Sequence, residues 1–373
     1  MKKINFIDLN RQYKSLRSEI DMSISEVIEK ANFIQGEEVK IFEQKLKEYV
    51  SANALTVANG TDALFISLRA LGIGPGDEVI TPSFTWVSTV ETIKLVGAQP
   101  IFCDISKETF NLDENLLEEL ITDKTKAIMP VSLFGRCPDL KRINEIAKKF
   151  KIFTIEDAAQ SFGAKSSGRM SCSIADISTT SFFPAKPLGC YGDGGAIFSN
   201  NDQLFEEASI ISKHGQKGRY NYLTIGVNSR LDTIQAAILI QKLRVFESEI
   251  KRRNEIASKY NNLLSSSGYI DCPEIPNDDN RSVWAQYTII LDKDFIGKRE
   301  EIMNLLKEDG VPSALYYPAA LHLQRPYFSD IRLEITEDIA KRVISLPMHP
   351  YLEDEEVEYI TDSFLNALKH SAL

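Results

Sequence analysis

The sequence predicts an α/β fold: a mostly parallel central sheet flanked by helices, with a smaller C-terminal α+β domain. Short apolar segments alternate with amphipathic segments from about residue 50 to residue 200, which is the pattern of parallel strands joined by helices. The chain has 373 residues, too many for one simple core, so two domains are expected. A long helical pattern from Asp232 towards Leu264 predicts the crossing between a large domain (1–245) and a small domain (246–373).

Hydrophobic periodicity predicts the individual elements. Two helices are expected at 15–30 and 37–49, and the first of them is expected to be able to pack on the small domain. Strands are predicted at 54–57, 78–81, 99–103, 127–131, 153–156, 197–198 and 284–291. Further helices are predicted from about residue 62 to Ala70 and at 85–96, 113–120, 139–150, 203–213, 298–308 and 354–369.

Composition excludes several functional classes. A formal net charge of −10 argues against a general nucleic-acid binder, which needs a basic surface. No apolar stretch is long enough to cross a membrane, and the start has no signal-peptide pattern. Five scattered cysteines fit reduced thiols and a cytoplasmic location. The four histidines are far apart in sequence, so no catalytic metal is predicted.

Lys186 stands in an unusual setting for a lysine. Prolines at 184 and 187 prevent a helix around it, and a glycine-rich run follows it. Such a lysine is a candidate for an amine that points into a pocket and forms a Schiff base with an aldehyde cofactor. The hydroxyl-rich segment 178–181, upstream, offers groups that suit a phosphate. A solvated loop lysine is the alternative interpretation.

Two further candidate segments follow predicted strands. In Asn59-Gly60-Thr61-Asp62, main-chain N–H groups at a helix N-terminus and the Thr61 hydroxyl form a phosphate cradle. An N-cap turn without a ligand explains the same residues. Trp86 is placed to lie flat on a heteroaromatic ring, and packing in the core is its alternative.

The last two candidate segments supply charged and polar groups. Asp157, at a strand end, is suited to pair with a protonated pyridine nitrogen. Gln160, three residues later, is on the same helical face and in reach of a ring hydroxyl. Asp157 as an N-cap with an exposed Gln160 is the simpler alternative. The segment 213–232 adds cations, although Lys217 and Arg219 also fit a solvated face.

These segments, in this order, are the layout of a fold-type-I pyridoxal-phosphate (PLP) enzyme. Over nearly its whole length the chain resembles the DegT/StrS family of PLP-dependent sugar aminotransferases. The segments that carry the resemblance are Phe-Ile-Asp-Leu-Asn at 6–10, Asn-Gly-Thr-Asp-Ala at 59–63, Asp-Ala-Ala-Gln at 157–160, Ser-Phe-Phe-Pro-Ala-Lys at 181–186, Gly-Asp-Gly-Gly at 192–195 and Ser-Leu-Pro-Met-His-Pro at 345–350.

The resemblance implies a role for each candidate residue. Lys186 would carry the Schiff base with PLP, Asp157 would bind the pyridine nitrogen and Gln160 the ring hydroxyl. Trp86 would stack on the ring where relatives have Tyr or Phe. The phosphate would be held by Gly60, Thr61 and Ser181. The family forms homodimers with composite sites, so the resemblance also implies that Asn228 reaches the cofactor phosphate of the partner subunit.

Within the family, the segments 182–192 and 226–235 look most like enzymes that act at C3 of UDP-2-acetamido-2-deoxy-3-keto-glucuronate. By that resemblance Arg230 would pair with the sugar carboxylate, which a guanidinium matches bidentately. Tyr316, Tyr317 and His322 are the other expected substrate contacts. Tyr316 stands where this subgroup is expected to have His, so the substrate assignment is less specific than the cofactor assignment.

The predicted reaction is therefore transfer of an amino group from L-glutamate to a nucleotide-linked keto sugar, with Lys186 as general base and acid. Biosynthesis of a surface polysaccharide such as the O-antigen of lipopolysaccharide is the implied context. A C4-keto or dTDP-3-keto-deoxy sugar aminotransferase is the alternative. A PLP-dependent sugar dehydratase resembles this chain less, because those members carry His in place of Lys186. A non-catalytic regulator on the same fold is the remaining alternative.

Overall fold

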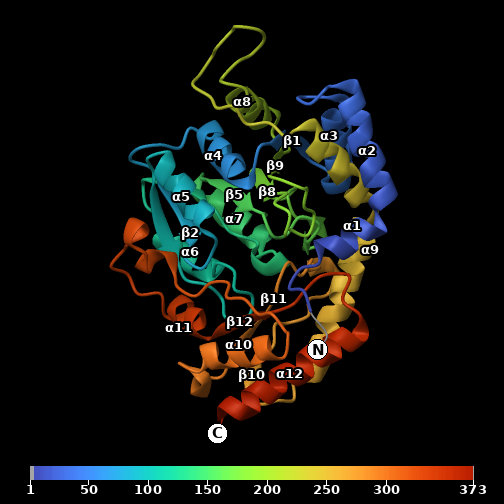
Figure 1. The fold of residues 1–373 in the computed structure, drawn as a ribbon. Helices are drawn as coiled ribbons and strands as arrows, with labels where there is room; N and C mark the ends of the chain where they lie inside the picture. Colours follow the sequence, from blue (N-terminus) through green and yellow to red (C-terminus); the bar gives the residue numbers. More distant parts are fainter. Residues whose placement is uncertain (1–3, 373) are drawn as a thin grey trace.

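Two separate sheets and a small hairpin, all covered by helices, make up the computed structural model, which describes residues 4–372 (Figure 1). The larger sheet has seven strands in the order β1-β9-β8-β5-β4-β2-β3. They are β1 (Asn53–Val57), β2 (Glu78–Pro82), β3 (Gln99–Cys103), β4 (Thr125–Ile128), β5 (Phe153–Asp157), β8 (Ile177–Ser181) and β9 (Gly195–Ser199). Within this sheet β9 runs opposite to both its neighbours and the other pairs are parallel. The prediction of a mostly parallel sheet is confirmed.

Helices pack on both faces of this sheet and on the smaller sheet. They are α1 (Leu9–Ser15), α2 (Arg17–Lys30), α3 (Glu37–Val50), α4 (Gly60–Ala70), α5 (Val87–Leu95), α6 (Leu117–Leu120), α7 (Leu140–Phe150), α8 (Asp202–Ser212), α9 (Thr233–Leu264), α10 (Arg299–Glu308), α11 (Glu334–Arg342) and α12 (Asp354–Ala372). Ile197 of β9 packs in one apolar cluster with Leu64 of α4. The next residue, Phe198, belongs to a cluster on the opposite face with Phe42 of α3 and Phe246 of α9. This alternation buries the sheet on both sides, as expected for parallel strands.

The smaller sheet is antiparallel and consists of β10 (Ile270–Asp271), β11 (Tyr287–Leu291) and β12 (Val343–Leu346). It shares an apolar cluster with the second half of α9, with α10 and with α12, including Tyr260, Ile302 and Phe364. The predicted boundary at 245/246 lies inside α9 and stays a prediction. Arg11 of α1 forms an ion pair of 2.7 Å with Glu356 of α12, which joins the N-terminal helices to the C-terminal region (Figure 1).

Several elements differ from the sequence-based expectations. The helix predicted at 15–30 begins at Arg17 as α2, and α1 before it was not predicted. The strand predicted at 284–291 begins at Tyr287. Strands β8 and β12, helix α11 and the hairpin of β6 (Lys165–Ser166) and β7 (Arg169–Met170) were not predicted. Among residues 4–372, no helix combines the length and the hydropathy that a membrane-spanning helix requires.

Candidate active site

A pocket of about 620 Å³ lies at the carboxyl ends of the parallel strands. Asp157 ends β5, Ser181 ends β8, and Asn59 follows β1, so the topology of the sheet brings these three lining residues together. The predicted site residues that line the pocket are Gly60, Thr61, Trp86, Asp157, Gln160, Ser181, Lys186, Tyr316 and Tyr317. Its volume is in the range of pockets that bind small molecules and cofactors.

One wall of the pocket is the N-terminus of α4. The Asn59 side chain caps the helix by accepting a hydrogen bond of 2.8 Å from the Asp62 N–H. A Cβ added to Gly60 would come within 2.8 Å of the Ser181 Cβ, so only glycine lets the helix start pack directly against the end of β8. The Thr61 and Ser88 hydroxyls are hydrogen-bonded to each other at 2.8 Å. Free N–H groups, hydroxyls and the positive end of the helix dipole together suit a phosphate.

The opposite wall presents the Asp157 carboxylate. Its Oδ2 accepts a hydrogen bond of 2.8 Å from the Thr89 hydroxyl, and its Oδ1 accepts one of 3.1 Å from the Ala159 N–H. Burial raises the pKa of Asp157, while the hydrogen bonds from Thr89 and Ala159 and the charge of Lys186 oppose that rise. A cationic ring nitrogen beside this carboxylate would favour its ionised form. Thr89, one helical turn after Thr85, was missed by the sequence analysis.

The residue before Asp157 is anchored behind the site. Glu156 is fully buried and accepts hydrogen bonds from the Ser132 hydroxyl (2.8 Å), the Ser171 hydroxyl (2.6 Å) and the Cys172 N–H (2.8 Å). Burial raises the pKa of Glu156, and these hydrogen bonds oppose that rise. The network holds the end of β5 and therefore the backbone of Asp157 in a single position.

Lys186 lies on an irregular loop between β8 and β9 (residues 182–192, the lysine loop), and its side chain is half-buried. Desolvation lowers the pKa of Lys186, and the charge of Asp157 opposes this effect. Within residues 4–372 its Nζ forms no ion pair within 4.0 Å. A partly desolvated amine with a lowered pKa is more often neutral, which is the form that acts as nucleophile or base.

Gln160 and the aromatic side chains complete the pocket. The Gln160 Oε1 accepts a hydrogen bond of 2.8 Å from the Phe134 N–H, and its Nε2 donates one of 3.2 Å to the Tyr317 hydroxyl. These bonds orient the amide with its NH₂ group towards Tyr317. Trp86 lies at the mouth, 58 % exposed, with its ring centroid 6.3 Å from that of Tyr317. It does not occupy a core position, which was its alternative interpretation.

Three predicted site residues do not line the pocket. Asn228 is exposed and Arg230 is half-buried, and both lie on the connection between α8 and α9 (residues 213–230, the projecting loop). Figure 1 shows this loop extending past α8. His322 is fully buried, and its ring is 2.8 Å from the Ser83 hydroxyl and 3.3 Å from the Glu337 carboxylate. The position of His322 fits support of the segment before Trp86 better than direct substrate contact.

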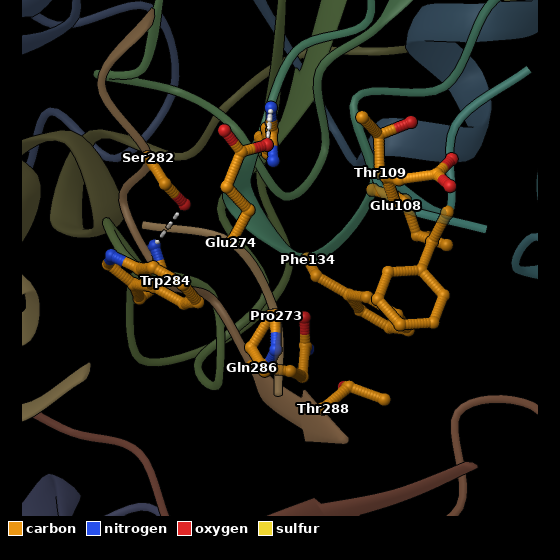
Figure 2. A pocket seen from close by; sticks show the side chains of 12 residues that line it. Glu108, Thr109, Phe134, Pro273, Glu274, Ser282, Trp284, Gln286 and Thr288 are labelled. Atoms are coloured by element: carbon orange, nitrogen blue, oxygen red, sulfur yellow. Dashed lines mark hydrogen bonds and ion pairs between the residues drawn. The ribbon is translucent and has the colours of Figure 1, made fainter. Parts of the chain in front are cut away.

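The pocket also contains residues that the sequence analysis did not select, including Ile7, Ser88 and Gln286. Gln286 also borders a second hollow of about 20 Å³, drawn in Figure 2. Its lining residues include the Arg136–Glu274 ion pair of 2.9 Å and the Trp284 N–H to Ser282 hydroxyl hydrogen bond of 3.1 Å, both marked by dashed lines in Figure 2. It has room for about one water molecule, so it is not a cofactor site.

The residues of the large pocket fit PLP. The α4 N-terminus offers donors for a phosphate, Asp157 offers a buried carboxylate for a ring nitrogen, and Lys186 offers an amine in the same pocket. A side chain at Gly60 would occupy the space beside Ser181, between two of the residues expected to hold the phosphate. These are the groups that a PLP site requires, and they arise from three separate segments of the chain.

Comparison with known proteins identifies the family. Residues 14–365 match the DegT/DnrJ/EryC1/StrS aminotransferase family. The chain belongs to this family. It is a PLP-dependent aminotransferase with the fold-type-I architecture. Both expectations from the sequence are confirmed.

Three similar proteins cover almost the whole chain. The UDP-2-acetamido-2-deoxy-3-oxo-D-glucuronate aminotransferase of Pseudomonas aeruginosa is 49 % identical over 366 residues, 97 % of this chain and 100 % of that protein. A pleiotropic regulatory protein of Geobacillus stearothermophilus is 40 % identical, over 99 % and 100 % of the two chains. The structure of NtdA from Bacillus subtilis with the bound cofactor PMP is 31 % identical with a TM-score of 0.92, over 99 % and 86 % of the two chains.

Proposed function

We propose that this aminotransferase moves an amino group from L-glutamate to C3 of a UDP-linked 2-acetamido-2-deoxy-3-keto-glucuronate. The observation that carries the substrate assignment is the 49 % identity, over 97 % of this chain and 100 % of the relative, to an aminotransferase of that name. The chemistry is supported independently, because Lys186 and Asp157 line one pocket together with the N-terminus of α4.

Each lining residue has a task in this proposal. Bound PLP supplies a ring that withdraws electrons and stabilises negative charge at the Cα of the amino donor. Asp157, held by Thr89, keeps the ring nitrogen protonated, and the Gln160 amide binds the ring hydroxyl. Gly60, Thr61 and Ser181 hold the phosphate, and Trp86 covers the ring.

Lys186 has two tasks. Its amine would hold the cofactor, and the neutral amine would also act as general base and acid for the proton at the donor Cα. Desolvation lowers the pKa of Lys186, which increases the fraction of neutral amine near neutral pH. The same residue works in the opposite direction when the keto sugar receives the amino group.

The proposal includes a homodimer with composite sites. Asn228 and Arg230 lie outside the pocket of their own chain, and the projecting loop carries exposed apolar side chains, Tyr220, Tyr222, Leu223 and Ile225. A second copy that covers this loop would receive Asn228 at its cofactor phosphate and Arg230 at the sugar carboxylate. We place the reaction in the cytoplasm, in amino-sugar supply for a surface polysaccharide such as O-antigen.

A substrate panel tests the assignment. The PLP-loaded protein and L-glutamate are supplied with UDP-linked 3-keto sugars that have or lack the C6 carboxylate, and with a 4-keto nucleotide sugar. Formation of 2-oxoglutarate is expected only with the 3-keto sugars, and about tenfold or more faster with the carboxylate than without it. Equal or greater turnover of the 4-keto sugar would replace this proposal with the C4 alternative. One relative is named as a regulatory protein. Absence of turnover with every substrate would therefore favour a non-catalytic regulator.

A further inference from the structure

The side chain of Lys242, in helix α9, lies against the lysine loop. We infer that Lys242 is a positioning residue that holds this loop, and with it Lys186, in place. The inference rests on the proposed role of Lys186, because it concerns how that amine is presented to the pocket. It adds a residue that belongs neither to the pocket lining nor to the sequence motifs.

Lys242 is 1 % exposed, which is rare for a lysine. Its Nζ donates a hydrogen bond of 2.6 Å to the Gly189 carbonyl oxygen, and it lies 4.2 Å from the centroid of the Tyr191 ring. Among residues 4–372 no carboxylate lies within 4.0 Å of this ammonium group. The charge is therefore compensated by a carbonyl and an aromatic face, and both belong to the lysine loop.

A second side chain of the same helix holds the same segment. Gln235 precedes Lys242 by seven residues, which places both on one face of α9. Its Oε1 accepts a hydrogen bond of 2.8 Å from the Tyr191 N–H, and its Nε2 lies 3.5 Å from the Tyr191 carbonyl oxygen. Helix α9 thus contacts the loop at adjacent points, three and five residues after Lys186.

Close packing transmits this hold to Lys186. A Cβ on Gly189 would come within 2.5 Å of the Pro184 carbonyl oxygen and 2.6 Å of the Phe183 carbonyl oxygen. The Gly189 backbone therefore lies directly on the residues that precede Lys186. The Phe183 carbonyl also accepts a hydrogen bond of 2.8 Å from the Lys186 N–H. Displacement of Gly189 cannot leave this turn unchanged, because packed backbone does not deform independently.

The chemistry of the buried amine is consistent with a specific role. Desolvation lowers the pKa of Lys242 to about 8, and Glu249 opposes this effect. Burying an amine destabilises a fold unless the amine is hydrogen-bonded, and a methionine of similar length would fill the space without that cost. The carbonyl bond to Gly189 is what a methionine could not make.

The test compares Lys242→Met with the parent protein, both as PLP-free and PLP-loaded full-length protein. Hydrogen exchange by mass spectrometry is followed on peptides that cover residues 183–191, whose amides at Lys186 and Tyr191 are protected by the bonds above. Loss of a charge-assisted bond is expected to speed exchange there by about tenfold or more. PLP affinity, measured by titration of the PLP-free protein, should fall by a similar factor, and the pH midpoint of the visible band of lysine-bound PLP should shift.

Arg253→Met is the matched control. It removes another buried cation of α9, which donates to the Trp284 and Met348 carbonyls at 3.0 and 3.2 Å and not to the lysine loop. Exchange in 183–191 that is unchanged in Lys242→Met, or equally accelerated in both variants, would overturn the inference. Lys242→Arg keeps a cationic donor and should restore most of the protection.

If Lys242→Met does not fold, Gln235→Ala is measured in the same way. Faster exchange confined to the peptide with Tyr191 supports the hold by α9, and unchanged exchange contradicts it. The exchange measurement needs neither substrate nor turnover. It therefore stays informative even if the substrate panel rejects the proposed function.

Discussion

The lysine loop and the projecting loop are both irregular and rich in glycine, but their environments are opposite. Phe182, Leu188 and Cys190 of the lysine loop are buried, and side chains of α9 fix its backbone. In the projecting loop Tyr220 is 72 % and Ile225 is 79 % exposed. That loop is held mainly at its base, where the His214 N–H donates to the Val227 carbonyl at 2.8 Å and the Val227 N–H to the Ile211 carbonyl at 2.8 Å.

This difference indicates that the lysine loop is fixed within a single chain, and it supports the proposal that a second copy covers the projecting loop. A loop that presents a reactive amine must hold it within a fraction of an ångström, and burial achieves this. A loop with several exposed apolar side chains is typical of a surface that another molecule covers. The predictions below begin with the largest expected effect.

The largest effect is expected when Lys186 is removed, with Lys217 of the projecting loop as the comparison. Lys186→Ala should lower kcat by about 10⁴-fold or more, because it loses both the covalent anchor and the proton carrier. The visible absorption of lysine-bound PLP should disappear as well. Lys217→Ala, in the projecting loop, removes a surface ion pair with Glu206 and should stay within about twofold of the parent. Full activity of Lys186→Ala would contradict the proposed role.

A hybrid dimer tests whether the loops of two chains meet. Arg230→Met should raise KM for the sugar by about 10- to 100-fold, because a charge-assisted contact is lost. A purified hybrid of one Lys186→Ala chain and one Arg230→Met chain contains one site with both native residues only if Arg230 acts across the interface. Such a hybrid should show about half the kcat of the parent dimer, with the parent KM. A hybrid that keeps the raised KM would show that Arg230 acts within its own chain.

A charge on the projecting loop should weaken self-association. Ile225→Asp places a carboxylate where a partner would bury an apolar side chain, and the dimer dissociation constant is expected to rise by about tenfold or more. Sedimentation velocity over a range of protein concentrations measures this change. Leu95→Asp is the control, because Leu95 of α5 is also exposed (65 %) but lies outside this loop. Equal effects of both substitutions would remove the projecting loop from the interface.

The smallest effect concerns the pH at which each lysine reacts. Desolvation lowers the pKa of Lys186 below its ordinary value of 10.5. At any pH below that value, a larger fraction of Lys186 than of an ordinary lysine is therefore neutral and nucleophilic. The hydrogen bond to Glu206 raises the pKa of Lys217, which has the opposite sign. Acetylation of the PLP-free protein, quantified by mass spectrometry, should therefore reach half-maximal rate at a lower pH for Lys186 than for Lys217. The reverse order would mean that the lysine loop does not desolvate its amine.

Sequence reasoning identified most of the pocket because its residues follow strand ends in short contiguous motifs. It missed β8 (Ile177–Ser181) as a strand, since its hydroxyl-rich sequence resembles a loop. In the fold the Thr180 hydroxyl donates a hydrogen bond of 2.9 Å to the Ala158 carbonyl oxygen. The Ser178 hydroxyl donates one of 3.3 Å to the Glu156 carboxylate. These bonds satisfy the polar side chains inside the sheet.

His322 is a different case. The family resemblance implied substrate contact, whereas the fold buries its ring between Ser83 and Glu337. A histidine next to pocket residues in sequence has no fixed direction until the chain is packed. Thr89 and Glu156 were missed for the same reason, because their importance lies in what they contact.

The sequence by itself determined the fold class and the family and predicted the role of Lys186, because alternation and short motifs are local properties of the chain. Only the tertiary structure decided which side chains hold that chemistry in place. Lys242 is 53 positions from Gly189, and its hydrogen bond depends on α9 packing against the sheet. Contacts over such separations follow from the packing of the whole chain and have no local sequence pattern. The same contacts make the burial of a charged group tolerable.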